Sequence, residues 1–156
     1  MGNQHPSTLE ERIKLLAINA VFGDGQLWKH PECKNYKIRY TSTSPELLEA
    51  KRSIAPEIFK TGVKFLDTSR HKGRYANAKP IYRLDSIVHP IITGVANIEK
   101  TELLNELTIE DFALWYLDDG CLVKRREYKD KVYYRYILCI GDSANTQVKL
   151  NNLSAR

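Results

Sequence analysis

The chain has 156 residues, of which 42% are hydrophobic and 28% are charged, and this composition suits a single domain with its own core. Its 24 Lys and Arg and 19 Asp and Glu give a net charge of +5, a mild excess that alone favours nucleic acid only weakly. The sequence lacks the roughly 18-residue apolar run of a membrane span, a signal-peptide pattern at its start and the many cysteines of a disulfide scaffold. We therefore expect that the protein is not secreted and has no membrane partner. We expect it in a reducing compartment, either the cytoplasm, where it would associate with the nucleoid, or an organellar matrix.

The charged residues are unevenly distributed. Residues 64–83 contain six basic side chains and one acid, residues 124–135 contain six more basic side chains, and residues 99–119 contain seven acids and one lysine. Two basic segments on either side of an acidic one suit a protein that grips phosphates at two places and holds a cation between them. The alternative is that these segments are ordinary solvated faces.

The first expected element is a helix. Ser7 or Thr8, followed three residues later by Glu10 or Glu11, forms a capping-box pattern. The apolar sequence RIKLLAINAVF then continues the helix up to the Gly-Asp-Gly of residues 23–25. We expect the two glycines to let the chain turn out of the helix.

Strands and a second helix follow. The alternation of Tyr36, Ile38 and Tyr40 with polar residues predicts a half-buried strand. Ser44 as N-cap and Pro45 at the first helical position predict a helix that ends near the next proline. The remaining expected elements of this half are strands at residues 62–70 and 79–86 and a short helix between Pro90 and Gly94.

The second half of the chain restarts the same order of elements. Thr108 with Asp111 three residues later is another cap signal, and the helix EDFALWYLDD that follows again ends at Asp-Gly. We expect two strands, CLVKRRE and KVYYRYILCI, and then the start of a helix capped by Ser143. The two Asp-Gly pairs are 95 residues apart, a separation typical of a domain duplication rather than a short-period solenoid.

Two segments carry a motif: LLAINAVFGDGQL, residues 15–27, and FALWYLDDGCL, residues 112–122. Both are apolar helices that end in Asp-Gly, and together they resemble the paired motifs of the LAGLIDADG homing endonucleases. The second segment is the closer match, and the first differs at Phe22-Gly23. The resemblance covers roughly residues 9–143, which is most of the chain.

This resemblance implies an α+β fold of two αββαββα repeats, each with a four-stranded antiparallel, saddle-shaped sheet, related by a pseudo-twofold axis at the paired motif helices. Residues 7–100 would form the first repeat and residues 101–156 the start of the second. Only 36 residues follow Gly120, so we expect the second copy to be incomplete and apolar surface to be exposed. The chain would then be a fragment, a shortened reading frame, or a piece completed by a second polypeptide or a second copy.

Asp24 and Asp119 end the two motif helices and are the candidate metal ligands and catalytic residues. A carboxylate at a helix C-terminus faces the negative end of the dipole, and two such acids brought together repel each other. A hard divalent cation, Mg²⁺ or Mn²⁺, relieves both effects because it prefers oxygen ligands. The alternative is that each aspartate is an ordinary turn residue before glycine.

Further site residues are expected near these two acids. Successive helical residues point about 100° apart, so Asp118 is not expected to share the ion with Asp119 and is interpreted as a polar residue at the helix end. The family uses a basic residue near the scissile phosphate, and the resemblance implies Lys100 for this catalytic role. Arg39 or Thr41, on the first long strand, is expected to help order the attacking water.

The strands are expected to bind DNA, because a twisted two-stranded ribbon fits the major groove. Tyr75 and Tyr82 among basic residues also allow base stacking on single strands, although tyrosine is common in sheets. The candidate DNA-binding residues are Lys37, Arg39, Thr41, Arg70, Arg83, Lys124, Arg126, Tyr133 and Arg135.

The sequence therefore predicts a site-specific endonuclease that hydrolyses phosphodiester bonds of double-stranded DNA with a divalent metal. One alternative is a non-catalytic nucleic-acid binder on the same scaffold, such as an intron RNA maturase or a transcription regulator. The other is a truncated remnant with neither activity.

Overall fold

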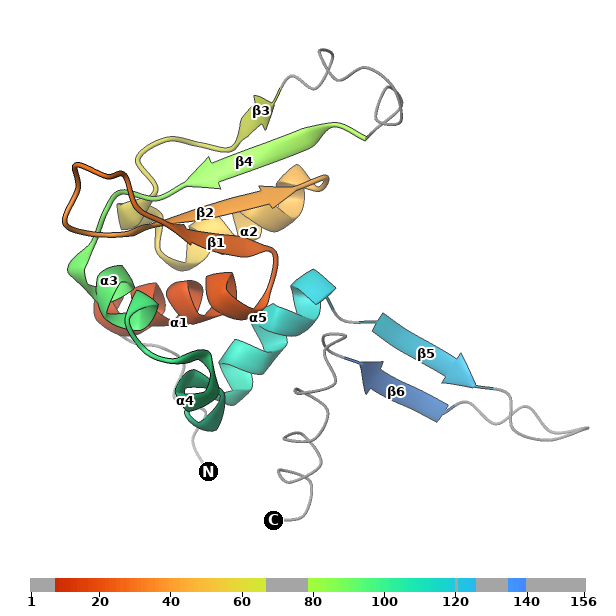
Figure 1. The fold of residues 1–156 in the computed structure, drawn as a ribbon. Coiled ribbons are helices and arrows are strands. Elements are labelled where there is room, and N and C mark those ends of the chain that lie inside the picture. The colour runs from red at the N-terminus through yellow and green to blue at the C-terminus, as the bar shows by residue number, and fades with distance from the viewer. Residues whose placement is uncertain (1–7, 67–78, 120, 126–134, 140–156) are drawn as a thin grey trace, which may run out of the picture.

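The computed structural model describes residues 8–66, 79–119, 121–125 and 135–139. The chain begins with the helix α1, and its last described element is the strand β6 (Figure 1). In chain order the elements are α1 (Leu9–Phe22), β1 (Gly25–Trp28), β2 (Lys37–Ser42), α2 (Pro45–Ile54), the 3₁₀ turn η1 (Pro56–Ile58), β3 (Lys64–Leu66), β4 (Ile81–Asp85), α3 (Pro90–Ala96), α4 (Lys100–Asn105), α5 (Ile109–Asp119), β5 (Cys121–Arg125) and β6 (Arg135–Cys139).

The main sheet is antiparallel throughout and has the strand order β1-β2-β4-β3. Its inner face carries the fully buried Ile38, Tyr40 and Leu84, which pack with α1 in the core. β5 and β6 pair antiparallel as a separate two-stranded sheet. This architecture confirms the predicted α+β fold with a four-stranded antiparallel sheet.

Local sequence signals explain where the helices begin. Thr8 accepts a hydrogen bond from the Glu11 backbone N–H at 3.2 Å, and the Glu11 carboxylate accepts one from the Thr8 N–H at 3.0 Å, so the predicted capping box is present. Ser44 caps α2 through the Leu47 N–H, with Pro45 at the first position, as predicted. At α5, Thr108 caps the Asp111 N–H, and the Asp111 carboxylate accepts in return from Thr108.

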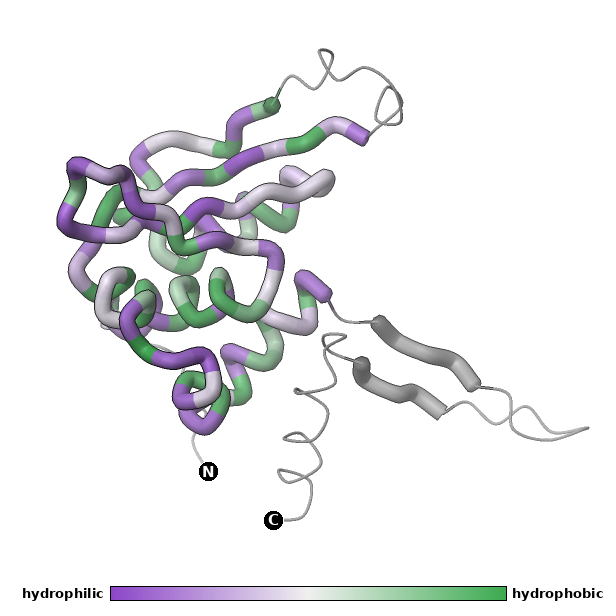
Figure 2. Tube along the Cα trace, in the orientation of Figure 1, coloured by the Kyte–Doolittle hydropathy of each residue, from purple (hydrophilic) through white to green (hydrophobic). Residues whose placement is uncertain are grey.

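α1 is the central helix of the molecule. It is largely hydrophobic along its length (Figure 2), and it contacts α3, α5, β1 and β2. Ile13, Leu16 and Ala17 are completely buried. A helix enclosed on several sides requires apolar residues nearly all round, which is what the motif sequence supplies.

The two glycines after α1 are required for space rather than for an unusual backbone. Gly23 has φ −101° and ψ −150°, an extended conformation in which the chain leaves the helix. A Cβ atom on Gly25 would lie 2.5 Å from the Ala20 Cα and 2.7 Å from the Tyr40 ring. The chain therefore leaves the helix at these glycines, as expected, and close approach of neighbouring atoms is what requires glycine there.

Other differences from expectation lie in the second half. Residues 100–105 form the short helix α4, which no sequence signal predicted. α5 leaves Ile109 and Leu117 exposed, and the predicted final helix from Ser143 lies outside the described residues. The division into repeats at residue 100 stays a prediction. In the part of the chain that the structure describes, no helix has the length and apolarity to cross a membrane.

Candidate nuclease site: the acidic ends of the paired helices

The C-terminal ends of α1 and α5 lie in contact, and the residues at this contact differ between the two motifs. Aligning the two Asp-Gly pairs makes Gly23 the counterpart of Asp118. A Cβ atom on Gly23 would lie 2.9 Å from the Asp118 Cγ and would overlap its Oδ2. The Asp118 carboxylate therefore occupies the space that the missing side chain of Gly23 leaves open.

Asp118 is bound on both of its oxygen atoms. Its Oδ1 forms an ion pair with the Lys51 Nζ at 2.5 Å, and the side chains of Lys51 and Asp118 are only 2% and 0% exposed. Its Oδ2 accepts hydrogen bonds from the Asn19 Nδ2 and from the Asp24 backbone N–H, each at 3.1 Å. Asp118 lies at the end of α5, as expected, but no sequence signal indicated that its carboxylate is buried against α1. The rotation that separates it from Asp119 turns its side chain toward that helix.

Lys51 is a buried lysine that the sequence interpretation missed. It comes from α2, and its Nζ lies 4.1 Å from the centroid of the Tyr40 ring. Burial lowers the pKa of Lys51, while the neighbouring acids, Asp118 first, oppose this shift. One signal could have found it, since Lys51 lies three residues after Leu48 on the apolar face of α2.

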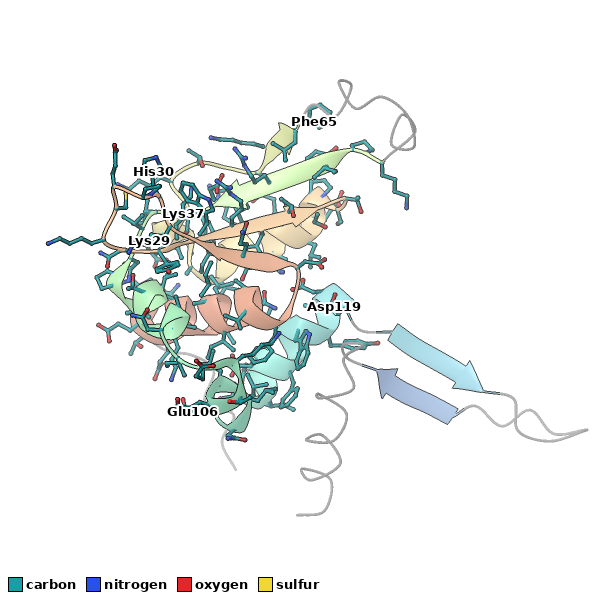
Figure 3. All side chains as sticks on the ribbon, in the orientation of Figure 1. Lys29, His30, Lys37, Phe65, Glu106 and Asp119 are labelled. Atoms are coloured by element: carbon teal, nitrogen blue, oxygen red, sulfur yellow. The ribbon has the colours of Figure 1, made fainter. Side chains whose placement is uncertain are left out.

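Asp24 and Asp119 are close enough to interact electrostatically. Both residues are exposed, and Figure 3 shows Asp119 at the end of α5. The pKa of Asp24 is raised by partial burial first, then by the charges of Asp118 and Asp119, while Lys51 lowers it. The Asp119 Oδ2 also accepts a hydrogen bond of 3.3 Å from the Trp115 indole. The structure thus brings the two predicted acids to one place.

The donor set at this place suits a hard cation that is completed from outside the protein. The described residues contain no group of three or more His, Cys, Asp or Glu side chains that could hold a metal ion. Asp118 is already paired with Lys51, which leaves the two carboxylates of Asp24 and Asp119. Mg²⁺ is commonly bound by one or two carboxylates together with water and substrate phosphates, and the residues present fit this arrangement.

Lys100 lies beside the end of α1, at the start of α4. Its Nζ is 5.1 Å from the centroid of the Phe22 ring, and that ring lies 5.1 Å from the Trp115 ring. The cation that lowers the pKa of Asp24 is Lys51. The catalytic role of Lys100 stays a prediction, and Lys51 is a second lysine next to the acids.

The outer face of the main sheet is basic. Lys37, Arg39 and Thr41 alternate along β2 with the buried core residues, and Arg83 on β4 pairs in register with Thr41. These four predicted residues therefore share the outer face. Tyr82 packs edge-on against Phe65, with 5.7 Å between ring centroids. Lys124 and Arg135 belong to β5 and β6, whereas Arg70, Tyr75, Arg126 and Tyr133 lie outside the described residues.

Asp85 is an unpredicted acid on this basic face. Its Oδ1 lies 2.9 Å from the Arg39 Nε and 3.2 Å from the Lys37 Nζ, and its Oδ2 lies 2.9 Å from the Arg83 Nε. Partial burial raises the pKa of Asp85, but the hydrogen bonds from Arg39 and Lys37 outweigh it and hold the pKa below its usual value. Lys37 and Arg39 also each lie 4.8 Å from the centroid of the Trp28 ring. One carboxylate thus holds three cations in place.

The fold is that of a homing endonuclease. It is similar to the solved structure of the homing endonuclease I-WcaI bound to its DNA recognition sequence, with a TM-score of 0.59 and 17% sequence identity. The similar region covers 77% of this chain and 60% of that chain. No protein-family model matches the chain, and no curated protein matches it by sequence. The likeness therefore establishes the fold, and the chemistry has to be argued from the side chains.

Proposed function

We propose that the protein is a LAGLIDADG-type endonuclease that cuts double-stranded DNA at a long asymmetric site. The observation that carries this proposal is the 3.1 Å hydrogen bond from the Asp24 backbone N–H to the Asp118 carboxylate, which joins the helix ends that carry Asp24 and Asp119. The strand β1 starts directly after Asp24, so the acids lie at the margin of the basic sheet. The DNA-bound state of the structurally similar I-WcaI supports DNA as the partner.

The basic outer face would dock the DNA. Lys37, Arg39 and Arg83 offer ammonium and guanidinium groups to phosphates, and arginine can also pair bidentately with guanine. The antiparallel ribbon of β2 and β4 presents these side chains on one side, as a reader of the major groove requires. Thr41, exposed on the same face, keeps its proposed part in ordering the attacking water.

Asp24 and Asp119 would hold Mg²⁺ or Mn²⁺, whose coordination shell the phosphate oxygens and water would complete. When bound, such an ion supplies an activated water and stabilises the charge that develops on the phosphate. The carboxylates themselves contribute negative charge at fixed positions. Burial first, and then the charges of Asp118 and Asp119, raise the pKa of Asp24, and a bound cation would oppose these effects.

A cleavage assay tests the proposal. The protein is incubated with a library of duplex DNA fragments in Mg²⁺ or Mn²⁺, and new ends are sequenced. We expect discrete cuts from the wild type and none from Asp24→Asn or Asp119→Asn, with DNA affinity nearly unchanged. Glu57→Gln, which removes one exposed carboxylate elsewhere, is the matched control and should cut normally.

The same assay separates the alternatives. Binding without nicking in either metal would favour a non-catalytic binder such as a maturase or regulator. A chain that shows no cooperative thermal transition and no binding would favour the inactive remnant. A wild-type cutting rate in either aspartate variant would remove that residue from the proposed metal site.

A further inference from the structure

The interface between the motif helices contains a charge pair that the metal site does not explain. The side chains of Asp118 and Lys51 are both buried, and they come from α5 and α2, each of which contacts α1. Replacing a buried ion pair with apolar residues of similar volume is often neutral or even stabilising. Stability alone is therefore a weak reason for this pair, and its contacts point to another role.

Those contacts lead to Asp24. The Asp118 Oδ2 accepts the backbone N–H of Asp24, so it fixes the peptide that carries the proposed metal ligand. The same oxygen also accepts a hydrogen bond from the Asn19 side chain, in the last turns of α1, and this bond fixes the position of the Asp118 carboxylate. Lys51 holds the other oxygen, and Lys51 is itself seated over the Tyr40 ring. Each bond in this series restrains the next.

The empty position at Gly23 makes this arrangement possible. With no side chain there, the carboxylate of Asp118 reaches the backbone at the very end of α1. A side chain at Gly23 would displace the carboxylate from the Asp24 N–H. The hydrogen bond between Asp118 and the Asp24 N–H therefore depends on the close fit between Asp118 and Gly23.

We propose that the Lys51–Asp118 pair is a positioning device that fixes the backbone of Asp24, so that its carboxylate faces Asp119. This inference rests on the proposed nuclease function. Lys51 and Asp118 act through Asp24 and are positioning residues, since neither needs to touch the DNA or the ion. The hydrogen bond between Asp118 and the Asp24 N–H does the positioning, and Lys51 neutralises the buried charge of the Asp118 carboxylate.

Two double variants separate positioning from mere stability. K51M/D118N removes both charges and keeps an amide oxygen that can accept the Asp24 N–H. K51M/D118L also removes both charges, at similar volume, but has no acceptor. Single-turnover cleavage at saturating DNA is measured below the unfolding temperature of each variant, together with DNA affinity. We expect K51M/D118N to cut within a few-fold of wild type and K51M/D118L to be roughly 10- to 100-fold slower at equal DNA affinity.

Equal cleavage rates in the two folded double variants would overturn the positioning role. If K51M/D118L does not fold, K51M/D118A is used instead, because alanine also lacks an acceptor and introduces no bulky side chain. The ¹H–¹⁵N resonance of Asp24 gives a readout that is independent of activity: its amide exchange should accelerate in the leucine variant and stay protected in the asparagine variant. A wild type that cuts no DNA would contradict only the nuclease proposal. Unchanged amide hydrogen exchange of Asp24 in both variants would contradict only the positioning inference.

Discussion

Asp118 and Asp85 organise two regions of the molecule, the contact between the paired helices and the outer face of the main sheet. Asp118, 0% exposed, binds one ammonium and two N–H groups between the paired helices. Asp85, whose side chain is 15% exposed, holds three cations on the outer face of the sheet. Both have charged or polar partners on each oxygen atom, but their different burial means that the loss of a partner has different effects at the two sites. The buried Asp118 has no water to replace a lost partner, whereas the partly buried Asp85 can exchange partners with solvent or with phosphate.

The largest effect should come from breaking the buried pair on one side. Lys51→Met leaves Asp118 as an unpaired buried charge, which costs about 3–5 kcal/mol of unfolding free energy. Urea unfolding measures the loss. Lys14→Met, which removes an exposed lysine 3.6 Å from Glu106, is the control and should cost less than about 1 kcal/mol. Equal losses in the two variants would mean that Lys51 is not effectively buried.

A smaller effect should follow from filling the space at residue 23. Gly23→Ala places a methyl group against the Asp118 carboxylate, so we expect a loss of about 1–3 kcal/mol from overpacking. Gly94→Ala, in α3 with no atom within 4 Å of the added carbon, is the control and should be neutral or stabilising. Thermal or urea unfolding of both variants gives the comparison, and a neutral Gly23→Ala would contradict the close contact.

On the sheet, the partly buried Asp85 should weaken DNA binding. Asp85→Asn frees cations that Asp85 now neutralises, so affinity for non-specific duplex DNA should rise a few-fold, and each new phosphate contact should steepen the salt slope by about 0.9. Fluorescence anisotropy over a range of salt concentrations measures both. Glu57→Gln makes the same change of charge away from this face and should leave the slope unaltered. Weaker binding by Asp85→Asn would mean that Asp85 instead holds the cations in their binding positions.

The smallest predicted effect concerns pH. Because the pKa of Asp24 is raised in the folded state, its charged form is disfavoured, and Asp24→Asn should raise the melting temperature at pH 7. The gain should shrink as the pH falls through the raised pKa and then below the usual aspartate pKa of 3.8, where the carboxylate is protonated in both the folded and the unfolded state. Melting curves from pH 7 to pH 3 test this sign. A gain that grows on acidification would contradict it.

Local and motif-based features could be predicted from the sequence because they depend on near neighbours. The Thr8 capping box and the Ser44 and Thr108 caps each involve residues three apart, and the structure has all of them. The four-stranded sheet followed from period-two alternation and the resemblance of the motifs. α4 was missed because its six residues carry no side-chain N-cap.

The missed site residues have partners far along the chain. Lys51 and Asp118 are 67 residues apart, and Asp85 is 46 residues from Arg39, so no local pattern joins them. Helical rotation correctly separated Asp118 from Asp119 but could not show what lies on the other side of the helix. The metal and the role of Lys100 stay predictions, because they depend on chemistry that side-chain placement alone does not test.

The unequal fit at Gly23 and Asp118 makes the contact between α1 and α5 asymmetric. Two copies of α1 meeting in this way would bring glycine against glycine and leave a gap, whereas two copies of α5 would oppose two aspartates and crowd the crossing. Only the two unlike helices supply one cavity and one side chain that fills it. The difference between residues 23 and 118 therefore disfavours a symmetric contact between two α1 helices or between two α5 helices.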